Sequence, residues 1–175
     1  MDLFKDAPTY VIDTCSIIDL RVWYPPEMAG DVWEVLGRLL DNGVVASVEE
    51  VLEELKVQED RVLEWAMRHR GAFLPIDVDL QRETKRILEA YPQLIDPKRR
   101  KSSADPFVIA AAQLYGATVV TEEKPSRPPA RPKIPNVCQG LELECIRIVE
   151  LFRREGYRFV LASETVDSDG RDDIG

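Results

Sequence analysis

Three carboxylates stand where a chain of alternating strands and helices should bring reactive groups together. Asp13 directly follows the apolar run Tyr10–Ile12, and Glu123 closes the stretch that begins with the run Ala117–Val120. Asp105 begins an apolar helix after a loop. Runs of this kind are typical of buried strands in a parallel sheet. Ligands of open α/β sheets bind beyond the carboxyl ends of the strands, so we expect these side chains to gather at one edge.

A cluster of like charges limits the chemistry that such a site can support. Carboxylates held close together repel, so the cluster needs a shared proton or a bound cation. His69 is the single histidine, which leaves Ser-His-Asp and Cys-His catalysis without a base and a zinc site short of its usual ligands. Oxygen ligands alone favour Mg²⁺ or Mn²⁺. These metals suit phosphodiester hydrolysis, where they activate water and stabilise the leaving oxygen.

Two uninterrupted groups of basic residues lie beside the candidate carboxylates, although the net charge of the chain is −9. The overall charge argues against a protein that coats nucleic acid without specificity. Local cations can nevertheless bind a phosphate backbone electrostatically, and solvated loop charge is the alternative interpretation. The predicted RNA-binding residues are Lys98, Arg99, Arg100 and Lys101 in the first group, and Lys124, Arg127, Arg131 and Lys133 in the second.

Each candidate acid also has a purely structural interpretation. Asp13 could form a turn at the end of its strand and satisfy its own backbone. Asp105 could be an N-cap, because Pro106 suits the first helical position. Glu54 belongs to a glutamate-rich helix in which most carboxylates would be solvated, but its place beside Leu55 puts it at the rim of the apolar stripe.

The predicted strands and helices that carry these groups alternate along the chain, which predicts an α/β fold with a parallel sheet. The pattern predicts strands at Tyr10–Ile12, Val44–Ala46, Phe73–Leu74, Ala117–Val120, within Leu141–Ile146 and at Tyr157–Leu161. It predicts a helix capped by Asp31 and closed by Gly43, one opened by a Ser47/Glu50 capping box, and helices at Asp60–Arg70, Asp79–Ala90, Phe107–Tyr115 and Ile148–Glu155. Asn136 is expected to cap a short turn after a mobile basic, proline-rich loop.

The length of 175 residues is most simply one domain, which we place at residues 1–162, followed by an acidic tail at 163–175 that we expect to be disordered. The sequence has no apolar run long enough to span a membrane and no secretory signal pattern. Its three cysteines are too few and too scattered for a disulfide framework. These features predict a cytoplasmic protein with free thiols.

Four short motifs in order make the sequence recognisable. They are Val-Ile-Asp13-Thr-Cys-Ser, Ser47 followed by Glu54-Leu55, Ala-Asp105-Pro-Phe-Val-Ile-Ala, and Val-Val-Thr121-Glu-Glu123. Together they resemble the PIN-like domain family over roughly residues 8–155, and are similar to VapC-type toxins. The resemblance implies a three-layer fold with a central parallel sheet flanked by helices. It also implies a metal-dependent endoribonuclease inhibited by an antitoxin protein, with a homodimer as a further expectation and no membrane association.

The resemblance assigns roles to individual residues of this chain. Asp13, Glu54, Asp105 and Glu123 match the four catalytic acids, and Asp13, Asp105 and Glu123 are expected to bind Mg²⁺ or Mn²⁺. The supporting residues are Thr14, Ser16 and Thr121. Glu123 departs from the family pattern, which has an aspartate at this position.

Other classes of protein with acidic strand ends fit less well. A phosphoacceptor receiver domain is not supported by Ala46-Ser47, where the second strand ends, and a haloacid-dehalogenase phosphatase requires Asp-x-Asp where the chain has Asp13-Thr14-Cys15. A PIN-like nuclease acting on structured DNA and a non-catalytic PIN-like interaction module remain as alternatives to the ribonuclease.

Overall fold

A five-stranded parallel sheet forms the centre of the molecule. The computed structural model describes residues 7–57, 61–95, 103–128 and 130–159. The strand order is β3-β2-β1-β4-β5, so the first strand is central and the chain crosses over between neighbours. The strands are β1 (Tyr10–Ile12), β2 (Val45–Val48), β3 (Phe73–Leu74), β4 (Thr118–Val120) and β5 (Cys145–Ile146).

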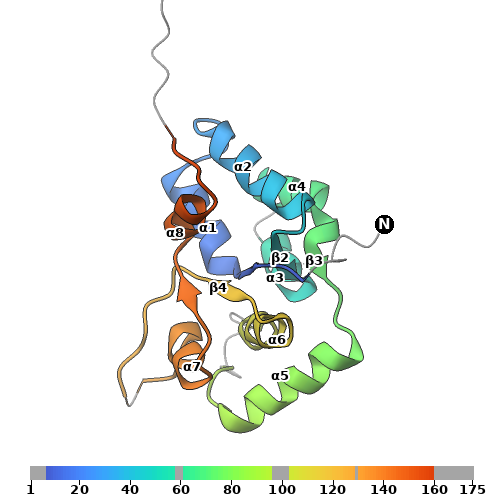
Figure 1. The fold of residues 1–175 in the computed structure, drawn as a ribbon, viewed down its shortest axis with the longest axis vertical. Coiled ribbons are helices and arrows are strands. Elements are labelled where there is room, and N and C mark those ends of the chain that lie inside the picture. The colour runs from blue at the N-terminus through green and yellow to red at the C-terminus, as the bar shows by residue number, and fades with distance from the viewer. Residues whose placement is uncertain (1–6, 58–60, 96–102, 129, 160–175) are drawn as a thin grey trace, which may run out of the picture.

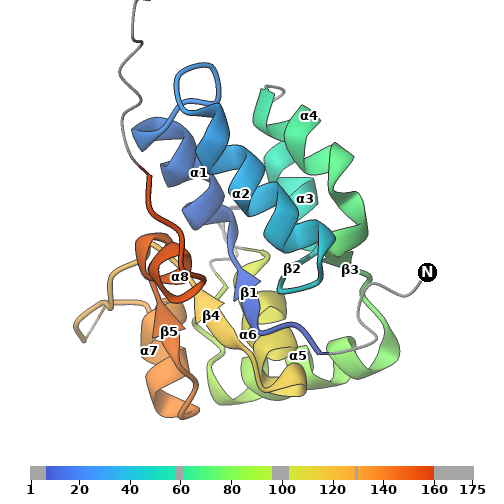
Figure 2. The same cartoon turned by 45° about the horizontal axis from the view of Figure 1, so that its top comes forward.

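Helices cover both faces of this sheet, which confirms the three-layer α/β architecture. The helices are α1 (Thr14–Trp23), α2 (Gly30–Asp41), α3 (Glu49–Lys56), α4 (Arg61–Arg68), α5 (Val78–Ala90), α6 (Asp105–Tyr115), α7 (Ile134–Gly140) and α8 (Ile148–Arg154), with a 3₁₀ turn at Arg70–Ala72. Figures 1 and 2 show α1, α2, α4 and α8 on one side of the sheet and α5, α6 and α7 on the other. Within the described ranges, no helix combines the length and apolar content that a bilayer crossing needs.

The register of the central strands brings the first and fourth strand ends together. Ile12 pairs with Val120, and the backbone N–H of Asp13 donates to the Val120 carbonyl at 3.1 Å. All three residues of β1 are buried, as its apolar, β-branched sequence predicts. Asp13 and Thr121 therefore leave the sheet side by side.

Helix α6 is the buried helix of the layer that contains α5, α6 and α7. It contacts β1, β2 and β4, and α5 packs against its outer side. Its run of alanines with Val108 and Ile109 is completely buried, which explains why almost no polar residue occurs in it. Gly116 ends the helix at φ 63°, a left-handed conformation that glycine adopts without steric cost. The buried apolar residues from β1 to α8 form one connected core, whereas residues 163–175 lie outside the described residues.

Several predicted element boundaries are wrong, and each for a local reason. Helix α1 was not predicted, because its apolar and polar residues show little helical periodicity. Ser47 lies inside β2 and donates its hydroxyl to the Ile12 carbonyl at 2.8 Å, so the expected capping box does not form. Asp31 lies in the first turn of α2, which begins at Gly30. Residues Tyr157–Phe159 form no strand, and the rest of that predicted strand is not described.

Candidate active site

Asp13 is a buried carboxylate fixed by two donors at the end of the central strand. It is the N-cap of α1: its Oδ1 accepts the backbone N–H of Ser16 at 2.7 Å, and its Oδ2 accepts the Thr121 hydroxyl at 2.5 Å. The Ser16 hydroxyl donates to the Val120 carbonyl at 3.2 Å. Asp13 therefore does have the structural role of a helix cap. The side chain is only 2% exposed, however, and a cap alone does not require such burial.

Asp105 is the acid for which the structural interpretation is wrong. It is the first residue of α6 rather than its N-cap; Ala104 occupies the cap position, and no side chain caps the helix. Asp105 is 9% exposed, and among the described residues its Oδ2 atom has no hydrogen-bond partner. A buried carboxylate oxygen without a donor is costly, so its retention points to a ligand or a proton as the missing partner.

Glu123 faces the other acids, whereas Glu122 faces away from them. Glu123 Oε2 accepts the Ile134 N–H at 3.1 Å, and its charge contributes to the raised pKa values of both aspartates. The Glu122 side chain is fully buried and binds Arg147 and the Ile148 N–H on the side of α8. The expected register, with Glu123 toward the site, matches this geometry.

Glu54 ties three elements together at the rim of the site. Its Oε2 accepts the Thr14 hydroxyl at 2.5 Å, and its Oε1 accepts the backbone N–H of Ala104 at 3.0 Å and the Ser103 hydroxyl at 3.2 Å. It therefore connects α3 to the start of α1 and to the residues that lead into α6. With both oxygens engaged, Glu54 fixes where Asp105 begins its helix.

The pKa values of both aspartates are far above those of ordinary carboxyls. Burial raises the pKa of Asp13 to about 7, against the lowering effect of the Thr121 and Ser16 donors. Burial also raises the pKa of Asp105 to about 8, and the charges of Glu123, Asp13 and Glu54 add to it. The positive charge of Arg131 lowers the pKa of Asp105 and so opposes these effects. The charges of Glu123, Asp13 and Glu54 all act on Asp105, which places the four acids in one electrostatic cluster.

A divalent cation fits the chemistry of these donors. The cluster offers oxygen atoms only, and Asp105 Oδ2 is a buried atom that lacks a partner. As the side chains stand, no group of three acidic, histidine or cysteine side chains in the described part of the chain is placed to hold an ion. The Asp13 oxygens face hydroxyl and amide donors, and Lys133 lies 3.5 Å from Glu123 Oε1. Ion binding would therefore require side chains to rearrange.

The basic residues fall into three groups. Lys98, Arg99, Arg100 and Lys101 lie outside the described residues. Arg131 and Lys133 are half-buried and act on Asp105 and Glu123 respectively. Lys124 and Arg127 are exposed. The second predicted cluster is therefore divided between two half-buried cations that act on the acids and two that are exposed.

The sequence predicted Asn136 as a cap, but Lys133 occupies the N-cap position of α7, and the contacts of Asn136 with the basic loop were not predicted. The Asn136 carboxamide binds Ser126 and Lys133 from the third position of α7, a larger role than capping a turn. The only sequence signal was an asparagine near a helix start, which is common in proteins without any such loop. Ser103 was also missed, because its contact with Glu54 joins positions 49 residues apart.

The chain belongs to the family described as "Domain of unknown function (DUF4411)", which matches residues 10–159. This range includes the whole sheet and all four acids of the cluster. No match was found among curated proteins. The family defines how far the shared domain extends and assigns no activity to it.

Proposed function

We propose that this protein is a metal-dependent endoribonuclease of PIN-like type. The proposal rests on the state of Asp105: its buried Oδ2 atom has no hydrogen-bond partner among the described residues. Asp105 also lies in one electrostatic cluster with Asp13 and Glu123. Two cations, Arg131 and Lys133, stand beside these acids. Carboxylates for a metal and cations for a phosphate are the groups that phosphodiester hydrolysis requires.

Asp13, Asp105 and Glu123 are the residues that would hold Mg²⁺ or Mn²⁺. When bound, such an ion lowers the pKa of a water molecule and neutralises charge that develops on the phosphate. Thr121 and Ser16 keep the Asp13 carboxylate in one orientation. Glu54 has a positioning role in this scheme, because Thr14, Ser103 and Ala104 occupy its oxygens. Lys133 would exchange its contact with Glu123 for one with the substrate phosphate.

The basic residues support a substrate with a phosphate backbone. Such binding is electrostatic and independent of sequence, so it suits exposed lysine and arginine on a loop. The exposed Lys124 and Arg127 would contact phosphates away from the cleaved bond. The residues 98–101 add four positive charges to the chain segment just before Asp105.

A cleavage assay tests this proposal and separates it from its alternatives. Purified protein is incubated with labelled single-stranded RNA, structured RNA and structured DNA, with Mg²⁺, Mn²⁺ or chelator, beside Asp13→Asn and Asp105→Asn. Metal-dependent RNA cleavage lost in both variants is the expected result. Cleavage of DNA alone would favour the DNA nuclease, and no cleavage of any substrate would favour the interaction module.

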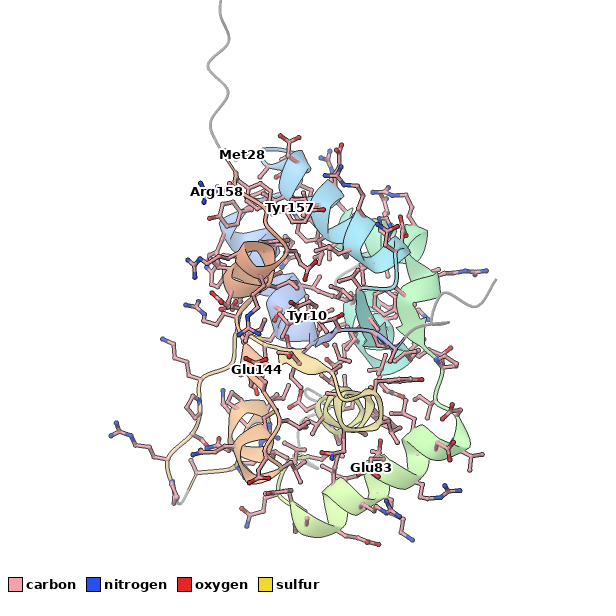
Figure 3. All side chains as sticks on the ribbon, in the orientation of Figure 1. Tyr10, Met28, Glu83, Glu144, Tyr157 and Arg158 are labelled. Atoms are coloured by element: carbon pink, nitrogen blue, oxygen red, sulfur yellow. The ribbon has the colours of Figure 1, made fainter. Side chains whose placement is uncertain are left out.

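The toxin role and the antitoxin partner are further parts of the proposal. An exposed apolar surface supports a protein partner: α1, the loop after it and α8 carry Val22, Trp23, Met28 and Val149 at 43–83% exposure. In Figure 3, Met28 lies at the same end of the molecule as Tyr157 and Arg158. Induced expression in a bacterial host should arrest growth, and Asp13→Asn should abolish the arrest. Unimpaired growth with the wild-type protein would contradict the toxin role.

A further inference from the structure

The loop between β4 and α7 is a basic, proline-rich arm. Its described residues, 124–128 and 130–133, project from the β5 side of the molecule in Figures 1 and 2. Lys124, Arg127 and Arg131 are each followed by proline, which restricts the preceding residue to extended conformations. At the outer end, the Ala130 N–H donates to the Arg127 carbonyl at 2.9 Å and closes a turn. We call residues 124–128 and 130–133 the basic arm.

One carboxamide fastens the outgoing and returning sides of the basic arm. Asn136 Oδ1 accepts the backbone N–H of Ser126 at 2.8 Å and that of Lys133 at 3.0 Å, and Asn136 Nδ2 donates to the Ser126 carbonyl at 3.0 Å. The Ser126 hydroxyl lies 2.7 Å from the Arg131 carbonyl and 3.0 Å from Asn136 Oδ1, so its single proton can join either.

These bonds exceed what helix capping requires. Capping of α7 uses only the bond that the Lys133 N–H donates to Asn136 Oδ1, because the lysine ammonium has no acceptor for the reciprocal bond of a capping box. The two backbone bonds to Ser126 join α7 to a residue ten positions earlier and do nothing for the helix itself. Their effect is to close the basic arm at its base.

The returning side of the basic arm carries the two cations that act on the acids. The returning side carries Arg131, which lowers the pKa of Asp105, and Lys133, whose Nζ lies 3.5 Å from Glu123. The Ile134 N–H, next in sequence, donates to Glu123 at 3.1 Å. Lys124 and Arg127, on the outgoing side and at the turn, stay exposed.

We propose that Asn136 is a positioning residue for phosphodiester cleavage, because its carboxamide holds the basic arm closed with Arg131 and Lys133 beside the carboxylates. The inference rests on the proposed function. An arm closed in advance loses little conformational entropy when substrate binds, and it holds two charges near the reacting phosphate. Asn136 touches neither substrate nor metal in this scheme and acts only through the arm.

A double-mutant cycle tests this role. Asn136→Ala should lower kcat/KM for RNA cleavage about ten-fold in the wild-type background, as is typical when a positioning contact is lost. In the Arg131→Gln/Lys133→Gln background, the same substitution should have almost no further effect, because the charges it positions are absent. An equal loss in both backgrounds would overturn the inference, since a general disturbance of α7 acts regardless of those cations. Asn42→Ala, at the C-terminal end of α2, is the matched control.

Hydrogen exchange supplies a readout that does not depend on activity. The Ser126 and Lys133 amides should be protected in the wild type and exchange rapidly in Asn136→Ala, whereas Asn136→Asp, which keeps the accepting oxygen, should retain the protection. Fast exchange of both amides in the wild type would refute the closed arm. Wild-type protein that cleaves no nucleic acid would overturn the proposed function and this inference together, whereas active wild type with an additive cycle would overturn the inference alone.

Discussion

Asp105 is the residue whose surroundings are hardest to explain by folding alone. Its pKa of about 8 in the folded protein compares with about 3.9 for an exposed aspartate. Between these values the folded state holds a proton that the unfolded chain has lost, so stability falls as pH rises from about 4 to about 8. Keeping this carboxyl buried therefore lowers the free energy of unfolding at neutral and alkaline pH.

Asp105→Asn should remove the part of this pH dependence that Asp105 contributes, whereas the part that comes from the raised pKa of Asp13 should remain. An amide cannot ionise, so the metal-free variant should be more stable than the wild type by several kcal/mol near pH 8, at about 1.4 kcal/mol per pKa unit, with a smaller difference near pH 4. Chemical denaturation in the presence of chelator, at several pH values, measures the change. Asp79→Asn, at an exposed position of α5, is the control. Parallel profiles for wild type and Asp105→Asn would contradict the assignment of a buried, raised-pKa carboxyl.

Substitution of Glu123 tests whether the fourth acid takes part in cleavage. Glu123→Gln keeps an oxygen for the Ile134 N–H but removes the negative charge, so metal-dependent cleavage should fall roughly 10- to 1,000-fold, with RNA binding little changed. Rate and affinity are measured separately, by single-turnover cleavage and by fluorescence anisotropy.

The neighbouring Glu122 supplies the comparison, although not the silent one that its position alone suggests. Its buried carboxylate accepts from Arg147 and the Ile148 N–H, so Glu122→Gln should lower thermal stability. The folded variant should still cleave RNA. If Glu122→Gln abolished cleavage while Glu123→Gln did not, the assignment of the fourth acid would be wrong.

At the scale of elements, Glu54 shows how helices fix the site. Glu54→Ala should weaken the junction of α1, α3 and the start of α6, lowering stability by roughly 1–3 kcal/mol, the usual cost of unsatisfied buried partners. Glu54→Gln keeps an acceptor for the Ala104 N–H and should lose less. Thermal unfolding of both variants tests this order. Equal losses would show that the carboxylate charge, and not the hydrogen bonds, is what matters.

Different cations of the basic arm should affect RNA affinity and the cleavage rate separately. Arg127→Gln removes an exposed cation, so RNA binding should weaken and the slope of log K against log salt should fall by about 1, with kcat unchanged. Lys133→Gln removes a cation beside Glu123, so kcat should fall more than affinity. Salt-dependent binding and saturation kinetics measure both. The reverse pattern would place the cleaved phosphate at the outer turn.

The sequence predicts elements with strong local signals and misses those set by distant partners. The apolar β1 and β4 and the buried α6 follow from their residues, and their ends were predicted within a few positions. Ser47 and Glu50 have the spacing of a capping box, which is why Ser47 was predicted to cap a helix. In the structure its hydroxyl instead donates to the backbone carbonyl of Ile12 on the neighbouring strand. Tertiary packing overrides a local motif in such cases, and no short window of sequence contains that information.

For the molecule as a whole, parallel strand topology made the candidate site predictable. Once the order of strands and helices is known, strand ends must share an edge, which brought Asp13 and Glu123 together. The closed arm was not predictable, because a loop of prolines and basic residues has the composition of a mobile segment. Its closure depends on Asn136 and Ser126, two ordinary polar residues ten positions apart.

The most direct test of the central claim is the single-turnover rate of RNA cleavage as Mg²⁺ or Mn²⁺ is added to chelator-treated protein. Cleavage should be absent without metal, rise to saturation with it, and fall by several orders of magnitude in Asp13→Asn, although that variant remains folded. A rate that does not depend on metal, or an Asp13→Asn variant that cleaves as fast as the wild type, would contradict catalysis at this cluster.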